Sequence, residues 1–378
     1  MSGPLSRAGD DPLGRYADGE WVCLHVGPRL TPWLDTFLGR PVRWRPRLPA
    51  RGVAAVVGWG LKGVSLQARD AARRAGLPYV AIEDGLLRSV GLGDTDGALS
   101  LVVDDIGIYY DATAPSRLEA LIAAPRSPAE QARAAALAQA WCAGRLSKYN
   151  HAPERAPPLR GPYVLAIDQT AGDASIALGQ ADAASFARML EAALDEHPGL
   201  PVLLKVHPDV VAGRKRGHFA ALTPGQAARV TLLAHDAHAP ALLESAAAVY
   251  TVTSQVGFEA LLWGRPVRCF GMPFYAGWGL TGDELPAPDR RGPHHRVTRE
   301  ALVHAALIDY PRCLDPRTGT LGTPEQLVAW MAAQRARVAQ LPAGSVPRGW
   351  GPPETGDAWP WRMLRALKRW RDRPAARR

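Results

Sequence analysis

Two adjacent carboxylates, Glu83 and Asp84, are the first feature of the sequence suited to acid–base chemistry. They precede a glycine, and Arg88 and Ser89 follow closely. Neighbouring carboxylates repel each other, which can raise one pKa and create a group that exchanges a proton near neutral pH. An ordinary acidic turn also explains an isolated Glu-Asp-Gly, and such turns are the commoner case.

A further carboxylate, Asp173, stands in a stretch of small and polar residues, Asp168–Ser175, that includes Gln169. The stretch follows an apolar run, so it is expected to leave a strand and precede a helix. Such a loop presents a carboxylate beside room for a substrate. The alternative is that Asp173 caps the helix, the commoner role of a lone aspartate there.

Two segments of the second half suit an anion such as a phosphate. Lys205 ends an apolar run, where a lysine is costly unless it meets an anion, and His207 follows at the strand end. A solvated strand end with a satisfied histidine fits equally. In the segment Thr253–Leu261, Ser254 and the free N–H groups of a helix start would form an anion site.

This helix start has two further residues of interest, Gly257 and Glu259. Gly257 lies in the first turn, and Glu259, one turn further on, is placed to reach a ribose. A simple serine N-cap is the alternative explanation of the segment.

Metal and cofactor motifs are weak or missing in the sequence. Asp94-Thr95-Asp96 matches a D-x-D pattern of metal-dependent enzymes, but a chain this rich in aspartate contains about one such match by chance. The histidines show no paired ligand spacing, and there is no G-x-G-x-x-G, Walker A or G-x-S-x-G motif. We therefore expect no metal ion and no cofactor.

Apolar strands that alternate with helices must position these residues. Helices are expected at Val64–Ala75, from Ser127 to about Cys142, and at Asp182–Glu196, Pro240–Ala247 and Gly257–Trp263. Strands are expected at Trp21–Val26, Val53–Trp59, Tyr79–Ile82, Leu99–Val103, Ile106–Tyr110, Tyr163–Asp168, Val202–Val206, Val230–Leu233, Val249–Thr253 and Val267–Phe270. This alternation predicts an α/β fold with two Rossmann-like domains, and ligands in the cleft between them at the strand ends.

The chain is long enough for two domains, with 378 residues of which 47 % are hydrophobic. Residues 151–162 contain four prolines and no apolar periodicity, which predicts a linker. We expect an N-terminal domain over 20–150 that carries the Glu-Asp-Gly motif, and a C-terminal domain over 163–340. A Pro/Gly connector and a basic amphipathic tail are expected over 341–378.

Most of the basic charge lies in this tail. Residues 361–378 hold eight cations and one acid, so they supply +7 of the formal net charge of +9. Nucleic-acid-binding proteins usually spread their cations over a folded face, so we expect no nucleic-acid partner. A helix with this pattern suits anionic headgroups, and a helix packed on the body is the equal alternative.

Cysteine usage and hydropathy indicate the compartment. The four cysteines form no C-x-x-C pair, which excludes a disulfide scaffold and fits a reducing cytosol. The N-terminus shows no secretory signal, and no run approaches the ~18–20 apolar residues of a membrane span. We expect a soluble, cytoplasmic enzyme.

In their order along the chain, these motifs resemble those of the bacterial capsule polysaccharide biosynthesis family, the KpsC-type β-Kdo transferases. The resemblance covers about residues 50–335, and its most specific string is Pro-Phe-Tyr-Ala-Gly-Trp-Gly-Leu-Thr at 273–281. The other matching segments are Gly58-Trp59-Gly60-x-Lys62, Glu83–Ser89, Asp104–Tyr110, Asp168–Ser175, Lys205-x-His207-Pro208, Ser254–Leu261, Tyr310-Pro311-Arg312 and Asp315–Gly319.

The resemblance implies a GT-B-like enzyme that transfers Kdo from CMP-Kdo and retains the β configuration. It implies a lysophosphatidylglycerol-linked or Kdo-terminated acceptor. A lipid-linked acceptor would make it useful for the basic tail to contact the anionic inner face of the inner membrane. Many relatives carry two such modules, whereas this chain has length for one. It is open whether the chain needs a second Kdo transferase as partner, makes one linkage or serves another polysaccharide.

The resemblance also implies roles for the acidic residues. Carried over by position, Asp173 resembles the family's nucleophile, which attacks the anomeric carbon and forms a covalent Kdo adduct. Two successive displacements then give net retention. Glu83 and Asp84 would manage protons and orientation at the acceptor hydroxyl.

The remaining site residues are expected to bind the donor. His207, Lys205 and Ser254 would stabilise the CMP phosphate as it leaves, and Glu259 would hold the ribose. Arg88 is expected to bind the Kdo carboxylate, because an arginine fork matches a carboxylate. The expected substrate site is completed by Ser89, Gln169, Ser175 and Gly257.

Two other functions fit the sequence. One is an inverting, sialyltransferase-like enzyme, since such enzymes also pair an acidic-acidic-Gly motif with a His-Pro and serines around CMP. Asp84 would then be the general base, and no adduct would form. The other is a module that binds a sugar or nucleic acid through the basic tail without catalysis. Product stereochemistry and CMP release distinguish these functions.

Overall fold

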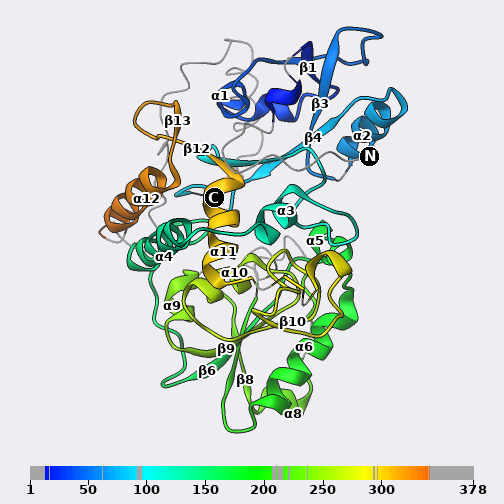
Figure 1. Ribbon diagram of the computed structural model, residues 1–378. Helices are drawn as coiled ribbons and strands as arrows, with labels where there is room; N and C mark the ends of the chain where they lie inside the picture. The colour runs from blue at the N-terminus through cyan, green and yellow to red at the C-terminus, as the bar shows by residue number, and fades with distance from the viewer. Residues whose placement is uncertain are drawn as a thin grey trace, which may run out of the picture.

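Two β-sheets, one above the other in Figure 1, form the framework of the computed structural model. The structure describes residues 13–16, 18–61, 63–91, 96–206, 210, 216–219, 222–235, 237–292, 294–295, 297–338 and 340. His207, Lys62 and the tail 341–378 lie outside the described residues. The expected α/β class, with two domains built on largely parallel sheets, is confirmed.

The first sheet has seven strands in the order β13-β12-β5-β4-β3-β1-β2. Strands β1 to β4 pair in parallel, whereas β5 runs antiparallel to β4. The described residues between β4 and β5 contain no helix, and a parallel pair would need a long crossover. The bounds are β1 (Glu20–Cys23), β2 (Val42–Trp44), β3 (Val53–Trp59), β4 (Tyr79–Asp84) and β5 (Ser100–Asp104), with helix α2 (Val64–Arg74) between β3 and β4.

The second sheet has six strands in the order β11-β10-β9-β6-β7-β8, all parallel. Its strands are β6 (Tyr163–Ile167), β7 (Val202–Lys205), β8 (Val230–Leu233), β9 (Ala246–Thr251), β10 (Val267–Cys269) and β11 (Gly282–Asp283). Its helices include α5 (Ala174–Leu178), α6 (Ala183–Glu196), α8 (Pro224–Ala227), α9 (Ala239–Leu243) and α10 (Gln255–Leu262). Helix α6 buries the apolar face that its sequence period predicts, around Phe186, Met189 and Leu190.

The segment Ile106–Tyr110, expected to be a strand, is a loop. The Asp104 side chain accepts hydrogen bonds from the N–H groups of Ile106 (2.9 Å) and Gly107 (2.8 Å), which turns the chain directly after β5. Such bonds compete with a strand ladder for the backbone donors. The turn carries Tyr109 to the second unit, where its ring lies 5.7 Å from that of Phe274.

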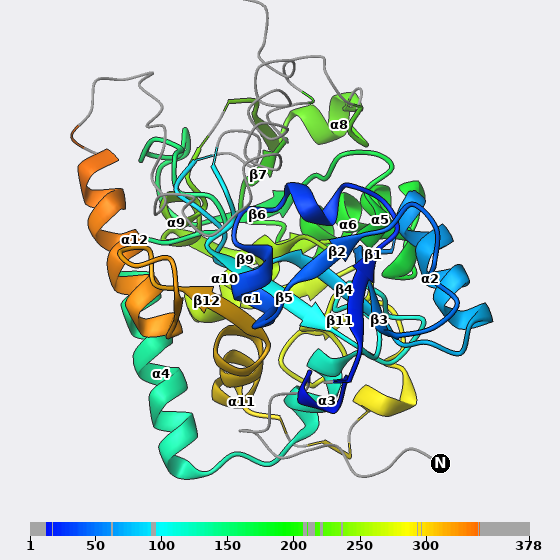
Figure 2. The same ribbon diagram turned by 90° about the horizontal axis from the view of Figure 1, so that it is seen from above.

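The end of the described chain returns to the first unit. After α11 (Arg299–Val303) and the helical turn His304–Asp309, strand β12 (Pro311–Leu314) pairs antiparallel with β5, and β13 (Leu321–Gly322) extends the sheet. Helix α12 (Pro324–Val338) then packs beside α4 (Pro128–Ala143) (Figures 1 and 2). Residues 311–338, expected in the C-terminal domain 163–340, therefore belong to the first unit, because β12 pairs with the open edge of β5.

Residues 151–162 form neither helix nor strand. A short helix, α3 (Arg117–Ala123), begins with a capping box in which Ser116 and Glu119 bond each other's backbone N–H groups. No helix in the described part of the chain is long and apolar enough to cross a membrane.

Candidate active site

The Glu-Asp-Gly carboxylates stand at the carboxyl end of β4, beside the turn that follows β3. Gly60 in that turn has φ +55, and a Cβ there would lie 2.9 Å from Glu83 Oε2 and closer still to the Tyr110 hydroxyl. The Leu61 N–H donates to this hydroxyl at 2.9 Å. The Gly-Trp-Gly segment thus supplies a turn in which only glycine leaves room for the acid and its neighbouring tyrosine.

Arg88 and Ser89, expected to bind substrate, are buried in the protein instead. Arg88 is 7 % exposed, and its guanidinium donates to Asp84 Oδ2 at 2.6 Å, to the Ser89 hydroxyl at 2.9 Å and to the Asp96 carbonyl at 2.9 Å. The Ser89 hydroxyl in turn donates to the Gly91 carbonyl at 2.8 Å. In this structure Arg88 holds Asp84 in place directly and Ser89 does so through Arg88, and substrate binding by the two residues stays a prediction.

Tyr109 joins the two units at the site. Its ring makes edge contacts with Tyr110 and Tyr310 of the first unit, at 5.2 and 6.3 Å, as well as with Phe274. Burial raises the pKa of Tyr109; Lys148 opposes this, whereas the carboxylates of Glu83, Asp84 and Asp173 add to it. The phenol of Tyr109 therefore stays protonated, and carboxylates of both units act on it electrostatically.

Asp173 is exposed and forms the N-cap of α5, where its side chain accepts a hydrogen bond from the Ser175 N–H at 3.0 Å. The capping alternative is thus confirmed. Capping uses one carboxylate oxygen, Oδ1, and leaves the group within electrostatic reach of Tyr109. The nucleophilic role stays a prediction.

Gln169 and Ser175 tie together the loops that follow β6 and β9. Gln169 is buried, accepts from the Thr253 N–H at 2.9 Å and donates to the Thr253 hydroxyl at 3.0 Å. The Ser175 hydroxyl lies 3.2 Å from that of Thr253. Gln169 therefore fixes the loop that carries Asp173, and its contacts in this structure are with protein groups.

Ser254 is the N-cap of α10, as the alternative explanation of this segment has it, and is half-buried, whereas its phosphate contact stays a prediction. Tyr275 donates a hydrogen bond to the Ser254 carbonyl at 2.5 Å. Gly257 is buried against the same tyrosine: a Cβ there would lie 2.7 Å from Tyr275 Cζ. Gly257 thus has a packing role, because only glycine lets Tyr275 hold the helix start, and its expected substrate contact stays a prediction.

Glu259 is 1 % exposed, and its carboxylate is hydrogen-bonded at the junction between the units. It accepts hydrogen bonds from the Ser147 hydroxyl (2.8 Å), the Lys148 N–H (3.2 Å) and the Gln255 amide (3.3 Å). Burial raises its pKa to about 7, against the lowering effect of these bonds. Contact with a ribose stays a prediction and would require these bonds to open.

Lys205 ends β7 and is half-buried, as its place in the apolar run predicts. The backbone here is joined to the loop after β6, since the Asp168 N–H donates to the Lys205 carbonyl at 2.9 Å. The Asp168 carboxylate is buried and lies 3.0 Å from His218 Nδ1, whose ring stacks on Phe186 at 3.6 Å. The sequence analysis missed His218, which no motif marks.

The family model described as capsule polysaccharide biosynthesis protein matches residues 54–156 and 143–313. The chain is also 45 % identical over 330 residues to capsule polysaccharide modification protein LipA of Neisseria meningitidis serogroup A / serotype 4A, over 83 % of this chain and 46 % of that protein. The chain belongs to the capsule polysaccharide biosynthesis family. It spans about half the length of the LipA relatives that it matches.

Two solved structures of the family resemble this one. The structure titled Thermosulfurimonas dismutans KpsC, beta Kdo 2,4 transferase, has a TM-score of 0.76 and 40 % identity, and the match covers 82 % of this chain and 97 % of that one. The beta Kdo 2,7 transferase of the same KpsC has a TM-score of 0.63 over 85 % of this chain and 100 % of that one; its 24 % identity speaks for the fold alone.

The most specific family string, 273–281, connects the two units at the site. Phe274 meets Tyr109, Tyr275 holds the start of α10, and the Pro273 and Ala276 carbonyls accept hydrogen bonds from Arg291. Its observed role is therefore to pack the two units together beside Tyr109 and the start of α10.

Lys148 is a cation of the site that the sequence analysis did not single out. It is half-buried, and its ammonium lies 6.0 Å from the centre of the Tyr149 ring. The rarity of lysine could have marked this residue in the sequence, since few of the chain's 45 cations are lysines. Within the described residues, no group of three or more His, Cys, Asp or Glu side chains could hold a metal ion.

Proposed function

We propose that the chain is a retaining β-Kdo glycosyltransferase that uses CMP-Kdo in capsule polysaccharide synthesis. Support comes from family membership and from the 40 % identity to a chain titled as a beta Kdo 2,4 transferase. The observation that carries the mechanism is the position of Tyr109, whose ring contacts Tyr110 of the first unit and Phe274 of the second. Burial raises the pKa of Tyr109, and Asp173 of the second unit and the Glu83–Asp84 pair of the first raise it further.

The first step is a displacement at the anomeric carbon. An Asp173 oxygen forms a bond to the anomeric carbon while the bond between that carbon and the phosphate oxygen breaks. CMP leaves with the electron pair of the broken bond. Negative charge grows on the phosphate, and Ser254, Lys205, His207 and the N–H groups at the start of α10 stabilise it. No metal ion or cofactor takes part in this scheme.

The second step restores the enzyme and sets the stereochemistry. The acceptor hydroxyl attacks the same carbon, the bond to Asp173 breaks, and Glu83, oriented beside Asp84, takes the proton of the hydroxyl. Two inversions at one carbon give net retention. The acceptor, a lipid-linked or Kdo-terminated glycan, enters from the first unit, and CMP-Kdo binds the second, as in a GT-B-like enzyme at the cytoplasmic membrane face.

Asp173→Asn tests this proposal, with Asp182→Asn as a matched control. Both aspartates are N-caps that accept a backbone N–H bond, and asparagine caps nearly as well, so both variants should fold. We expect Asp173→Asn to lower transfer by more than about a thousandfold, and Asp182→Asn to leave it unchanged. CMP release from CMP-Kdo with a Kdo-terminated acceptor, and NMR of the product, give the readouts.

An inverting reaction with Asp84 as base is the second candidate function. It is favoured by one observation: Asp84 Oδ1 is buried and accepts no hydrogen bond among the described residues. Product with inverted configuration, together with normal turnover by Asp173→Asn, would establish this candidate and reject the adduct. Binding of CMP-Kdo without any CMP release would favour a non-enzymatic module.

A further inference from the structure

Lys148 sits in a loop that both units hold in place. After α4, the Lys148 carbonyl accepts hydrogen bonds from the N–H groups of Arg88 (3.1 Å) and Ser89 (3.4 Å), directly behind the Glu-Asp-Gly motif. On the other side, its own N–H donates to the Glu259 carboxylate at 3.2 Å. The backbone of Lys148 is therefore fixed between the end of β4 and helix α10.

Neighbouring residues reinforce this loop. Asn150 is fully buried: its side-chain oxygen Oδ1 accepts from the Ser147 N–H at 3.0 Å, and its side-chain amide donates to the Ser89 carbonyl at 3.1 Å. Arg335 of α12 donates to the Asn150 carbonyl at 3.1 Å. A side chain on so firmly held a backbone loses little further freedom when a ligand binds it.

The ammonium of Lys148 is charged and has no acid bound to it. Burial lowers its pKa, but Tyr109, Tyr149 and the two carboxylates of the Glu-Asp pair outweigh this, so that the pKa is raised. Among the described residues Lys148 forms no ion pair, and Asp84 already has Arg88 as its partner at 2.6 Å. Neutralising Asp84 is thus not its task.

We propose that Lys148 binds an acidic group of the donor, the carboxylate of the sugar or the phosphate of the nucleotide. The proposal rests on the proposed function, since it needs an acidic donor in this cleft. Lys148 takes the part that the sequence assigned to Arg88, whose guanidinium is spent on Asp84, Ser89 and Asp96. Glu259 and Asn150 are positioning residues that hold its backbone.

Lys148→Met tests the proposal, because methionine keeps much of the length and removes the charge. We expect KM for CMP-Kdo to rise at least about tenfold, the loss of one charged hydrogen bond. Arg155→Met, in the exposed linker, is the control that removes a cation elsewhere and should leave KM unchanged. Thermal unfolding shows whether the variants are folded. If Lys148→Met is not folded, Lys148→Gln is measured in its place.

Binding of CMP alone separates the two acidic groups. If Lys148 binds the sugar carboxylate, the Kd of CMP stays unchanged in Lys148→Met; if it binds the phosphate, the Kd rises as KM does. A folded variant with KM and Kd both within twofold of the unaltered protein would overturn the proposal. If the unaltered protein releases no CMP from CMP-Kdo, the proposed function fails, which is a separate outcome.

Discussion

Glu259 shows how a single buried acid couples the units of this protein. All of its hydrogen-bond donors come from the junction: Ser147 and the Lys148 N–H from the loop after α4, and Gln255 from its own helix. Gln255 also donates to the Leu86 carbonyl of the first unit at 2.7 Å. Burying an acid is costly unless it is well bonded, and three donors offset part of that cost.

The raised pKa of Glu259 makes stability depend on pH. In the folded protein its pKa is about 7 instead of 4.5, so between these values the folded state holds a proton that the unfolded state has lost. Stability therefore falls as the pH rises from 4.5 to 7 and is level above. Glu259→Gln, neutral at every pH, should flatten this fall, which amounts to at most about 3 kcal/mol.

Denaturant unfolding of both proteins at pH 5 and pH 8 measures this difference. Glu244→Gln, at an exposed glutamate of the second unit, is the control and should keep the pH dependence of the unaltered protein. Equal pH dependence in Glu259→Gln and the unaltered protein would show that Glu259 is already ionised at pH 5.

The sequence predicted which acidic and hydroxyl residues lie at the candidate site better than it predicted the contacts that each of them makes. Asp173, Glu83, Asp84 and Ser254 lie at strand ends or helix starts, because apolar runs and turn residues mark those places along the chain. That Arg88 pairs with Asp84, and that the backbone of Lys148 is held behind the Glu-Asp-Gly motif, depends on the folded arrangement of the chain, which no local pattern encodes.

At the scale of elements, short turns decide where the candidate site residues Glu83 and Tyr109 lie. The turn after β3 presses Gly60 against Tyr110 and Glu83, and the turn after β5 sends Tyr109 to the second unit. The sequence predicted β3, β4 and the helix between them correctly. It failed at Ile106–Tyr110, whose apolar residues suggest a strand but whose donors are taken by Asp104.

Gly60→Ala tests the first of these turns. Gly60 has φ +55, and Gly76, exposed at the end of α2, has φ +64, so alanine carries a backbone strain of about 1–2 kcal/mol at each. Only at Gly60 would the methyl group meet Tyr110 and Glu83, whereas no heavy atom lies within 4 Å at Gly76. We expect Gly60→Ala to lose most transfer activity and Gly76→Ala to keep it.

CMP release and thermal unfolding, measured on both variants, separate activity from stability. Equal losses of activity in the two variants would mean that backbone strain, not the displacement of Glu83, explains the effect.

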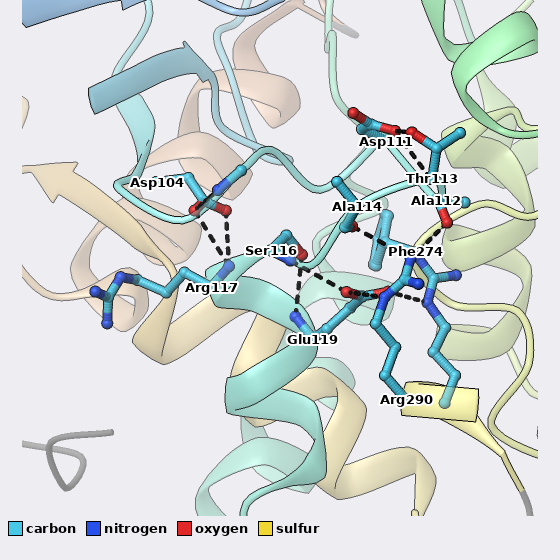
Figure 3. Close-up of polar contacts among 12 residues, drawn as sticks. Asp104, Asp111, Ala112, Thr113, Ala114, Ser116, Arg117, Glu119, Phe274 and Arg290 are labelled. Atoms are coloured by element: carbon cyan, nitrogen blue, oxygen red, sulfur yellow. Dashed lines mark hydrogen bonds and ion pairs between the residues drawn. The ribbon is translucent and has the colours of Figure 1, made fainter. Parts of the chain in front are cut away.

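At the scale of the molecule, an ion-pair cluster around Glu119 and Arg290 joins the two units (Figure 3). Glu119 of α3 accepts from Arg290 at 2.8 Å and from Arg291, both in the second unit. Arg290 also donates to the Ala112 and Ala114 carbonyls, just beyond the two tyrosines. The cluster therefore fixes the loop that carries Tyr109.

The sequence did not predict this level of organisation. It placed 311–338 with the second unit because they follow it along the chain, whereas the open edge of β5 draws β12 back to the first sheet. The pairing of Glu119 with residues some 170 positions later likewise depends on how the units meet.

Glu119→Gln should destabilise the whole protein, because it leaves the fully buried Arg291 without its anionic partner. Removing one partner of a buried pair costs about 3–5 kcal/mol, whereas an exposed pair is worth about 0–1 kcal/mol. Glu325→Gln provides the matched control, since its pair with Arg133 also joins distant helices but is 42 % and 46 % exposed. Denaturant unfolding should give a loss of several kcal/mol for Glu119→Gln and almost none for Glu325→Gln. Because the cluster also holds the Tyr109 loop, transfer by Glu119→Gln should fall even in conditions where it remains folded. Equal stabilities for the two variants would mean that the units are held together without this cluster.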